Sequence, residues 1–295
     1  MTLVACVKVN DGVVLAADSA LTMVVGSTPD GRIDAANLYN NANKIFNLCR
    51  GLPLGLLTWG SLVIGGVSVS NLVKEYRQQV QVADASAPSQ AAYTVYEMAK
   101  NLLDFLEVRF KNPYNGQPEN ETFNLGLLIA GYNPGAERAE EYIAGLRNEK
   151  QADGSLLLIL EGPTLIKYQG KAGPDIGAGV YVNGQPEAAQ RLIRGYGPIL
   201  NPLFDDIVPN MPDPAERTNW ENAQRALFSE LADSRMPIQD AIDLSVFLIE
   251  TTTKYLRFLV GPQTVGGPVE VAAITKYEGF QWVQRKYYYN RELNP

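Results

Sequence analysis

The chain has 295 residues, of which 46% are apolar and 19% charged, and its net charge is −7. This composition is typical of a globular protein with a sizeable core, and a disordered chain would be less apolar and more charged. The acidic balance without a cluster of Lys and Arg argues against nucleic-acid binding, because neutralising phosphates needs such clusters.

The cysteines and the termini indicate a compartment. The two cysteines, Cys6 and Cys49, lie in apolar strand-like runs and are too few for a disulfide framework, which favours a reducing environment. The N-terminus lacks the pattern of a signal peptide, and no apolar run approaches the length of a membrane span. We therefore expect a cytoplasmic protein with no membrane partner.

The first half of the chain is expected to open with a β-hairpin. Residues 2–9 and 13–17 are β-rich, and the Asn-Asp-Gly triplet at 10–12 tolerates the positive φ that tight turns require. Downstream, the patterns predict a loop over 27–43, strands over 44–49 and 53–58, and helices over 62–80 and 90–110.

The second half is expected to add another sheet and further helices. The patterns predict strands over 122–132, 139–146, 155–160 and 163–168, helices over 186–194, 215–231 and 237–258, and strands over 268–275 and 280–287. Strand blocks that alternate with paired helices predict an α/β (α+β) protein, a four-layer αββα sandwich of two mainly antiparallel sheets, or helices and sheets that segregate as α+β. No linker divides the chain, so we expect a single domain over 1–295.

Thr2 is the first candidate for chemistry. Removal of Met1 would leave Thr2 with a free α-amine beside its own hydroxyl, so that one residue supplies both nucleophile and base. This matters because the chain contains no histidine, the usual general base of serine and cysteine hydrolases. Thr after an initiator Met is nevertheless common, so Thr2 alone carries little weight.

Several segments together resemble the β-subunit family of proteasome-type N-terminal nucleophile hydrolases and its bacterial homologues. The opening segments are Thr2-Leu-Val-Ala, Asp11-Gly-Val-Val-Leu-Ala-Ala-Asp18-Ser19 and Asn43-Lys44-Ile45, and the later ones are 127–131, a glycine turn before a helix at 177–179, and 269–275. The resemblance covers most of the chain and implies the sandwich fold of N-terminal nucleophile hydrolases, with extra material near 112–121 and 197–235.

The resemblance also implies catalytic roles. Thr2 would be the nucleophile, Asp18 and Lys44 its charged partners, and Gly60 the donor of an oxyanion-binding backbone N–H. The α-amine has an unperturbed pKa of roughly 7.7 to 8.0, and the ammonium of Lys44 would favour its neutral form near pH 7. Asp18 is the natural counter-charge for a buried Lys44. Taken singly, an Asp such as Asp18 is most often a turn or helix-cap residue, Lys44 is a solvated charge and Gly60 a bend.

Three further residues are expected to contact substrate by the same resemblance. Ala20 and Thr22 lie where a strand would pair with the substrate backbone, and Thr58 where the floor of a side-chain pocket would lie. Plain strand packing is an equally good interpretation of each. The family usually has Ser in its mid-chain glycine turn, where this chain has Ala178, and that departure puts proton handling at the α-amine in doubt.

The expected function is that of a threonine peptidase acting on peptides or unfolded proteins, assembled as a homo-oligomeric ring as the resemblance implies. No metal or organic cofactor is expected, because zinc sites need His and Cys clusters and no phosphate-binding or dinucleotide-binding glycine motif is present. Two alternatives stay open: a non-catalytic structural or binding subunit, and an amidase for small molecules.

Overall fold

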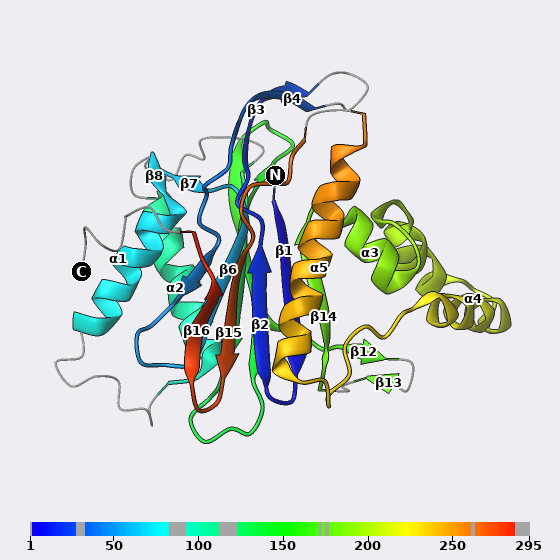
Figure 1. Cartoon of the computed structure of the whole chain (residues 1–295). Coiled ribbons are helices and arrows are strands. Elements are labelled where there is room, and N and C mark those ends of the chain that lie inside the picture. The colour runs from blue at the N-terminus through cyan, green and yellow to red at the C-terminus, as the bar shows by residue number, and fades with distance from the viewer. Residues whose placement is uncertain are drawn as a thin grey trace.

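The computed structural model describes residues 2–27, 33–82, 93–111, 123–170, 173–174, 177–260 and 263–286. Two five-stranded antiparallel sheets form the centre of the molecule (Figure 1). The first sheet has the strand order β14 (Gly179–Gly184), β1 (Leu3–Val9), β2 (Gly12–Ala17), β15 (Glu270–Thr275) and β16 (Gly279–Gln284). The second has the order β11 (Leu156–Leu165), β10 (Glu140–Lys150), β9 (Asn124–Gly131), β6 (Leu54–Gly60) and β5 (Ile45–Asn47).

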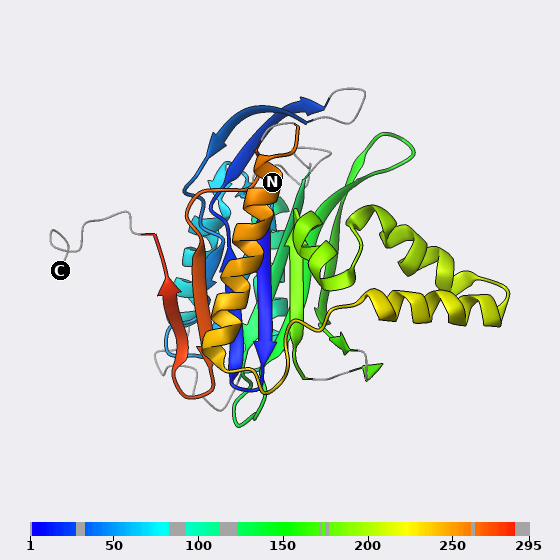
Figure 2. The ribbon, with the colours of Figure 1, turned by 45° about the vertical axis from the view of Figure 1, so that its right-hand side comes forward.

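Helices cover both sheets. The long helix α5 (Ile238–Arg257) packs on β1, β2 and β15 of the first sheet, with α3 (Glu187–Arg194) beside it. On the second sheet, α2 (Val95–Lys111) packs on β9, β10 and β11 and contacts α1 (Val69–Val82). Figures 1 and 2 show α5 against β1 and β2, on the opposite side of the molecule from α1. The predicted combination of helices with antiparallel sheets is confirmed.

Three large apolar clusters form the core around the two sheets, and strand alternation explains how β1 contributes to two of them. Successive side chains of a strand point to opposite faces. Val4 and Cys6 therefore join the cluster that includes Leu57 and Leu128 of the second sheet. Leu3 and its alternating neighbours join the cluster that includes the apolar face of α5. A third cluster lies between the second sheet and α1 and α2.

Two segments differ from the sequence-based prediction. The loop predicted over 27–43 contains β4 (Ile33–Tyr39), which pairs with β3 (Leu21–Ser27) as an antiparallel ribbon. The helix predicted from residue 62 begins only at Val69, after two short strands, β7 (Val63–Ile64) and β8 (Val67–Ser68). The glycines between these strands adopt positive φ, which closes a hairpin and ends any helical path from residue 62.

The middle of the chain contains further differences. The two strands predicted over 155–160 and 163–168 are the single strand β11, and a small hairpin follows it, formed by β12 (Gln169–Gly170) and β13 (Gly173–Pro174). The glycine turn expected to lead into a helix at 177–179 instead leads into strand β14. Strand β14 pairs with β1, a long-range partner that a local glycine pattern cannot reveal.

The segment predicted as extra material near 197–235 projects from the body of the molecule (Figure 2). It contains the helical turns η1 (Pro198–Leu200), η2 (Pro202–Ile207) and η3 (Val208–Asn210), followed by helix α4 (Pro214–Leu227). Asp213 caps α4 by accepting the Ala215 N–H at 2.8 Å. The extra material expected near 112–121 lies outside the described residues. Among the helices of the described ranges, none has the length and apolarity of a membrane span.

Candidate active site

Asp18 is the structural centre of the candidate site. It follows β2 directly, is fully buried, and accepts backbone N–H groups from Leu3 at 2.9 Å, Ala20 at 3.0 Å and Gly266 at 3.0 Å. Three N–H donors and a cation therefore occupy the acceptor sites of this carboxylate. The side chain thus fixes the start of β1, its own turn and the loop that precedes β15.

Lys44 forms an ion pair with Asp18. Its Nζ lies 2.5 Å from Asp18 Oδ1, and both side chains are completely buried. Burial lowers the pKa of Lys44, because desolvation disfavours the ammonium, while the negative charge of Asp18 opposes that shift. Lys44 immediately precedes β5, whose pairing with β6 sets the position of its backbone. The sequence-based prediction that Asp18 and Lys44 pair therefore agrees with their placement.

Thr2 is held next to this pair through its own peptide group. The N–H of the Thr2–Leu3 peptide donates to Asp18 Oδ1, the same oxygen that accepts from Lys44. The carbonyl of that peptide accepts the N–H of Gln185 at 2.8 Å. Gly184 lets the chain pass this carbonyl, since it has φ of 91° and a Cβ there would collide with the Thr2 oxygen. The structure thus brings Thr2, Asp18 and Lys44 together at one end of β1, with Thr2 itself buried.

Gly60 is the last residue of β6 and lies near Lys44, which precedes the neighbouring strand β5. The N–H of Thr58 donates to the Lys44 carbonyl at 2.9 Å, and strand alternation puts the Gly60 N–H on that same edge, beyond the end of β5. Gly60 has φ of 84°, and a Cβ there would collide with the Asn124 carbonyl. A donor that β5 does not cover is suitable for binding an oxyanion.

The three residues expected to contact substrate have structural partners. The N–H of Ala20 is used by Asp18, so it is not available for pairing with a substrate strand. The hydroxyl of Thr22 donates to the Thr264 carbonyl at 3.3 Å. Thr58 is fully buried, and its Oγ1 has no hydrogen-bond partner among the described residues. Their contact with substrate stays a prediction.

A second buried charge beside the site was not foreseen from the sequence. Lys286, two residues after β16, forms an ion pair with Glu270 at 2.7 Å and donates to Ser19, the neighbour of Asp18, at 2.8 Å. Glu270 is the one charged residue of strand β15, Glu-Val-Ala-Ala-Ile-Thr, and is 2% exposed. A buried carboxylate in such a strand needs a cation as partner, so Glu270 itself was the sequence signal that could have indicated a second ion pair.

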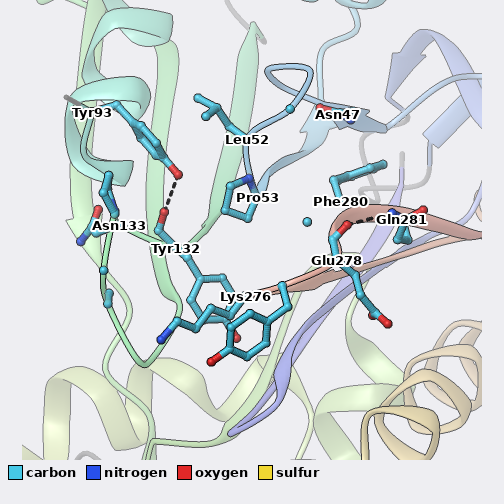
Figure 3. Close-up of a pocket in the computed structure, with 16 residues that line it drawn as sticks. Asn47, Leu52, Pro53, Tyr93, Tyr132, Asn133, Lys276, Glu278, Phe280 and Gln281 are labelled. Atoms are coloured by element: carbon cyan, nitrogen blue, oxygen red, sulfur yellow. Dashed lines mark hydrogen bonds between the residues drawn. The ribbon is translucent and has the colours of Figure 1, made fainter. Parts of the chain in front are cut away.

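The cavity shown in Figure 3 lies at the opposite end of the strands. Its volume is about 470 Å³, and the turns around 51–53, 132–136 and 276–281 form it. Gly12 pairs with Val9, the last residue of β1, and with Thr275, which directly precedes the cavity-lining turn at 276–281. The cavity therefore lies at the end of β1 opposite Thr2, ~23 Å away for a seven-residue strand. It is separate from the candidate active site.

No metal centre is evident in the part of the chain that the structure describes. It contains no group of three or more His, Cys, Asp or Glu placed to hold an ion. The groups around Thr2 are a hydroxyl, an amine once Thr2 is N-terminal, a buried ion pair and backbone N–H donors.

Comparison with known proteins gave structural matches only. No family model and no curated protein matches the chain. Anbu, the ancestral beta-subunit, from Yersinia bercovieri shares 14% identity over 97% of this chain and 89% of that chain, with a TM-score of 0.47. The helical assembly of the Anbu complex from Pseudomonas aeruginosa shares 12% identity over 99% and 90%, with a TM-score of 0.48. A Gly-1 mutant of Anbu from Hyphomicrobium sp. strain MC1 shares 15% identity over 99% and 92%, with a TM-score of 0.47.

These matches correct the family expected from the sequence. The resemblance pointed to the proteasome β-subunit family, whereas the structures found are Anbu proteins, a proteasome-like but distinct family. That expected membership is wrong. The identities of 12% to 15% and the TM-scores of 0.47 to 0.48 assign neither an activity nor an assembly to this chain.

Proposed function

We propose that this protein hydrolyses peptide bonds with Thr2 as an N-terminal nucleophile, after the residue that precedes Thr2 is removed. The observation that carries the proposal is the shared oxygen of Asp18, which accepts both from the Thr2–Leu3 peptide and from the buried Lys44. A buried charged pair is costly to maintain, and one fixed against a candidate nucleophile has a chemical use.

The reaction follows from these groups. The neutral α-amine of Thr2 accepts the proton of its own hydroxyl as Oγ attacks the carbonyl carbon of the peptide bond. The Gly60 N–H stabilises the oxyanion, and the amine returns the proton to the departing peptide nitrogen. Water then hydrolyses the acyl ester, which releases the acid and restores the hydroxyl. The positive charge of Lys44 favours the neutral amine throughout, and Asp18 keeps Lys44 in place.

The same proposal includes fold, assembly and location. We infer a single αββα domain over 1–295, because separate apolar clusters lie between the sheets and on the outer face of each. A ring-shaped homo-oligomer is supported by large apolar side chains on the surface, including Ile199, Phe258 and Val260, which are 84%, 83% and 98% exposed. The free, buried Cys6 and Cys49 suit a reducing cytoplasm.

One observation favours a second candidate, a non-catalytic subunit with the same fold. Thr2 is only 2% exposed, which limits the access of a substrate carbonyl to its hydroxyl. Ala178, which the resemblance put in place of a hydroxyl beside the α-amine, lies elsewhere, because its neighbour Gly179 pairs with Lys8, near the end of β1 opposite Thr2. The two candidates differ in whether Thr2 reacts.

The deciding experiment combines the mass of the mature N-terminus with reactivity. We expect loss of residue 1 in purified protein, a covalent adduct on Thr2 with a peptide β-lactone, and hydrolysis of unfolded casein. Thr2→Ala should abolish both adduct and hydrolysis, whereas Thr2→Ser keeps a hydroxyl and an amine and should retain measurable activity. Full activity in the Thr2→Ala variant would exclude the mechanism. Residue 1 retained in every molecule would favour the non-catalytic candidate.

A further inference from the structure

Lys286, whose charged side chain is largely buried, makes three contacts on three separate segments. Its ammonium donates to Glu270 Oε2 at 2.7 Å, to Ser19 Oγ at 2.8 Å and to the carbonyl of Ala42 at 2.7 Å. An ammonium has three protons, so these acceptors satisfy the group completely. Its side chain is only 7% exposed, and burial lowers its pKa although the charge of Glu270 opposes that shift.

Two of these contacts are adjacent to the charged pair of the candidate active site. Ser19 directly follows Asp18, and Ala42 lies two residues before Lys44. The two segments also touch directly, since the Ala42 N–H donates to the Ser19 carbonyl at 2.9 Å. Lys286 therefore joins the backbone that carries Asp18 to the backbone that carries Lys44.

Ser19 extends the network toward Gly266, which is itself a donor to Asp18. The Ser19 hydroxyl donates to the Pro268 carbonyl at 2.6 Å, and the Ser19 N–H donates to the Gly266 carbonyl at 2.9 Å. Every polar group of this fully buried serine is thus engaged. Glu270, at the start of β15, supplies the counter-charge that makes a second buried cation tolerable beside Lys44.

We propose that Lys286, with Glu270, is a positioning residue that fixes Asp18 and Lys44 relative to each other and so sets the reactivity of Thr2. Lys286 does not touch the reacting atoms and acts through the segments of Ser19 and Ala42. A plain structural ion pair would stabilise the fold without any selective effect on the Asp18 site. Only the part of the test that measures hydrolysis and labelling of Thr2 rests on the proposed function.

The first arm of the test does not depend on activity. The three backbone N–H groups that donate to Asp18, those of Leu3, Ala20 and Gly266, report on the position of its carboxylate. Lys286→Met would leave Glu270 buried without a partner, so the double variant Lys286→Met/Glu270→Gln, which removes both charges, is the main variant to compare with the wild type. We expect these three amides to exchange hydrogen at least about tenfold faster than in the wild type, with amides of β9 unchanged.

The second arm measures hydrolysis and labelling of Thr2 across pH. We expect kcat of the double variant to fall at least about tenfold with KM little changed, because the arrangement of the catalytic groups is altered and not substrate binding. In the Lys286→Met variant the acid limb of the pH profile should move to higher pH, since loss of a nearby cation raises the pKa of the base. Lys286→Arg, which keeps the charge, should restore the limb.

The matched control is Lys276→Met, which removes the Lys276 ion pair with Glu137, 2.7 Å apart, in the turn at the other end of β15. It should leave the exchange of the three amides and kcat unchanged. Unchanged exchange and kcat in the double variant would overturn the proposal, as would faster exchange spread evenly over the whole chain. If Thr2→Ala stays fully active while the three amides still exchange faster, the proposed function fails but Lys286 still positions Asp18.

Discussion

The substitution Asp18→Asn tests how much the buried ion pair contributes to stability, because it keeps the shape of the side chain and removes its charge. Lys44 is then left in the interior without a counter-charge, and breaking a buried pair in this way costs about 3 to 5 kcal/mol. The Asn also has only one acceptor oxygen for the N–H groups of Leu3, Ala20 and Gly266, so at least one of them loses its partner.

The expected loss is therefore about 4 kcal/mol, a large part of the 5 to 15 kcal/mol that stabilises a typical domain. It should depend on pH. Burial lowers the pKa of Lys44, and without Asp18 that pKa falls further. The unfolded chain then binds more protons than the native state between the lowered value and ~10.4, so the stability of the variant should rise with pH across that window.

The assay is urea unfolding followed by tryptophan fluorescence at pH 7 and pH 9.5, at one fixed protein concentration because assembly would shift the midpoint. Asp233→Asn is the control, because Asp233 pairs with Arg235 on the surface. This variant should unfold at the same urea concentration as the wild type. The reasoning is refuted if Asp18→Asn is as stable as the wild type at pH 7, or if its deficit grows as the pH is raised.

Three other predictions concern residues around this site and in the core. Gly184→Ala should lower the free energy of unfolding by more than about 1 kcal/mol and reduce labelling of Thr2 by the β-lactone, because a Cβ at residue 184 would displace the Thr2 carbonyl. The control Gly51→Ala has a similar φ, 83°, but open space around it, so it measures backbone strain without a collision, and equal effects of the two variants would contradict the prediction. Burial raises the pKa of Glu141 to about 7, so the stability that the protonated carboxyl contributes is lost as pH rises from ~4.3 toward 7. Glu141→Gln cannot ionise and should not show that loss. Urea midpoints of the wild type and the variant that change in parallel between pH 5 and 7.5 would contradict this prediction. Thr58→Val should raise the free energy of unfolding by about 1 kcal/mol in the same assay, because Oγ1 is buried without a partner among the described residues, and a decrease would show that the hydroxyl is satisfied.

Local chemistry explains which parts of the site were predictable. The Asn-Asp-Gly turn at 10–12 predicts the β1–β2 hairpin from neighbouring residues alone, and that hairpin is present. The pairing of Asp18 with Lys44 was implied by the resemblance, and the cost of burying either charge unpaired supported it. The donor Gly266 was not predictable, because it meets Asp18 across 248 positions of sequence and contributes only a backbone N–H.

The errors have the same physical origin. The glycine run at 177–179 has the local signature of a turn, and only the pairing of Gly184 with Leu3 shows that a strand follows it. The stretch 33–39 was interpreted as loop because it contains polar and small residues, yet its pairing with β3 makes it a strand. Strand formation depends on a partner as much as on propensity. Lys286 was missed because its three acceptors come from distant segments.

The carboxylate of Asp18 has a consequence for the order in which the site assembles during synthesis. Its donors come from Leu3 at one end of the chain and Gly266 near the other. A nascent polypeptide still attached to the ribosome lacks the later donor for most of its elongation, and a truncated product lacks it permanently. The full set of donors to Asp18 therefore forms only after residue 266 has been translated.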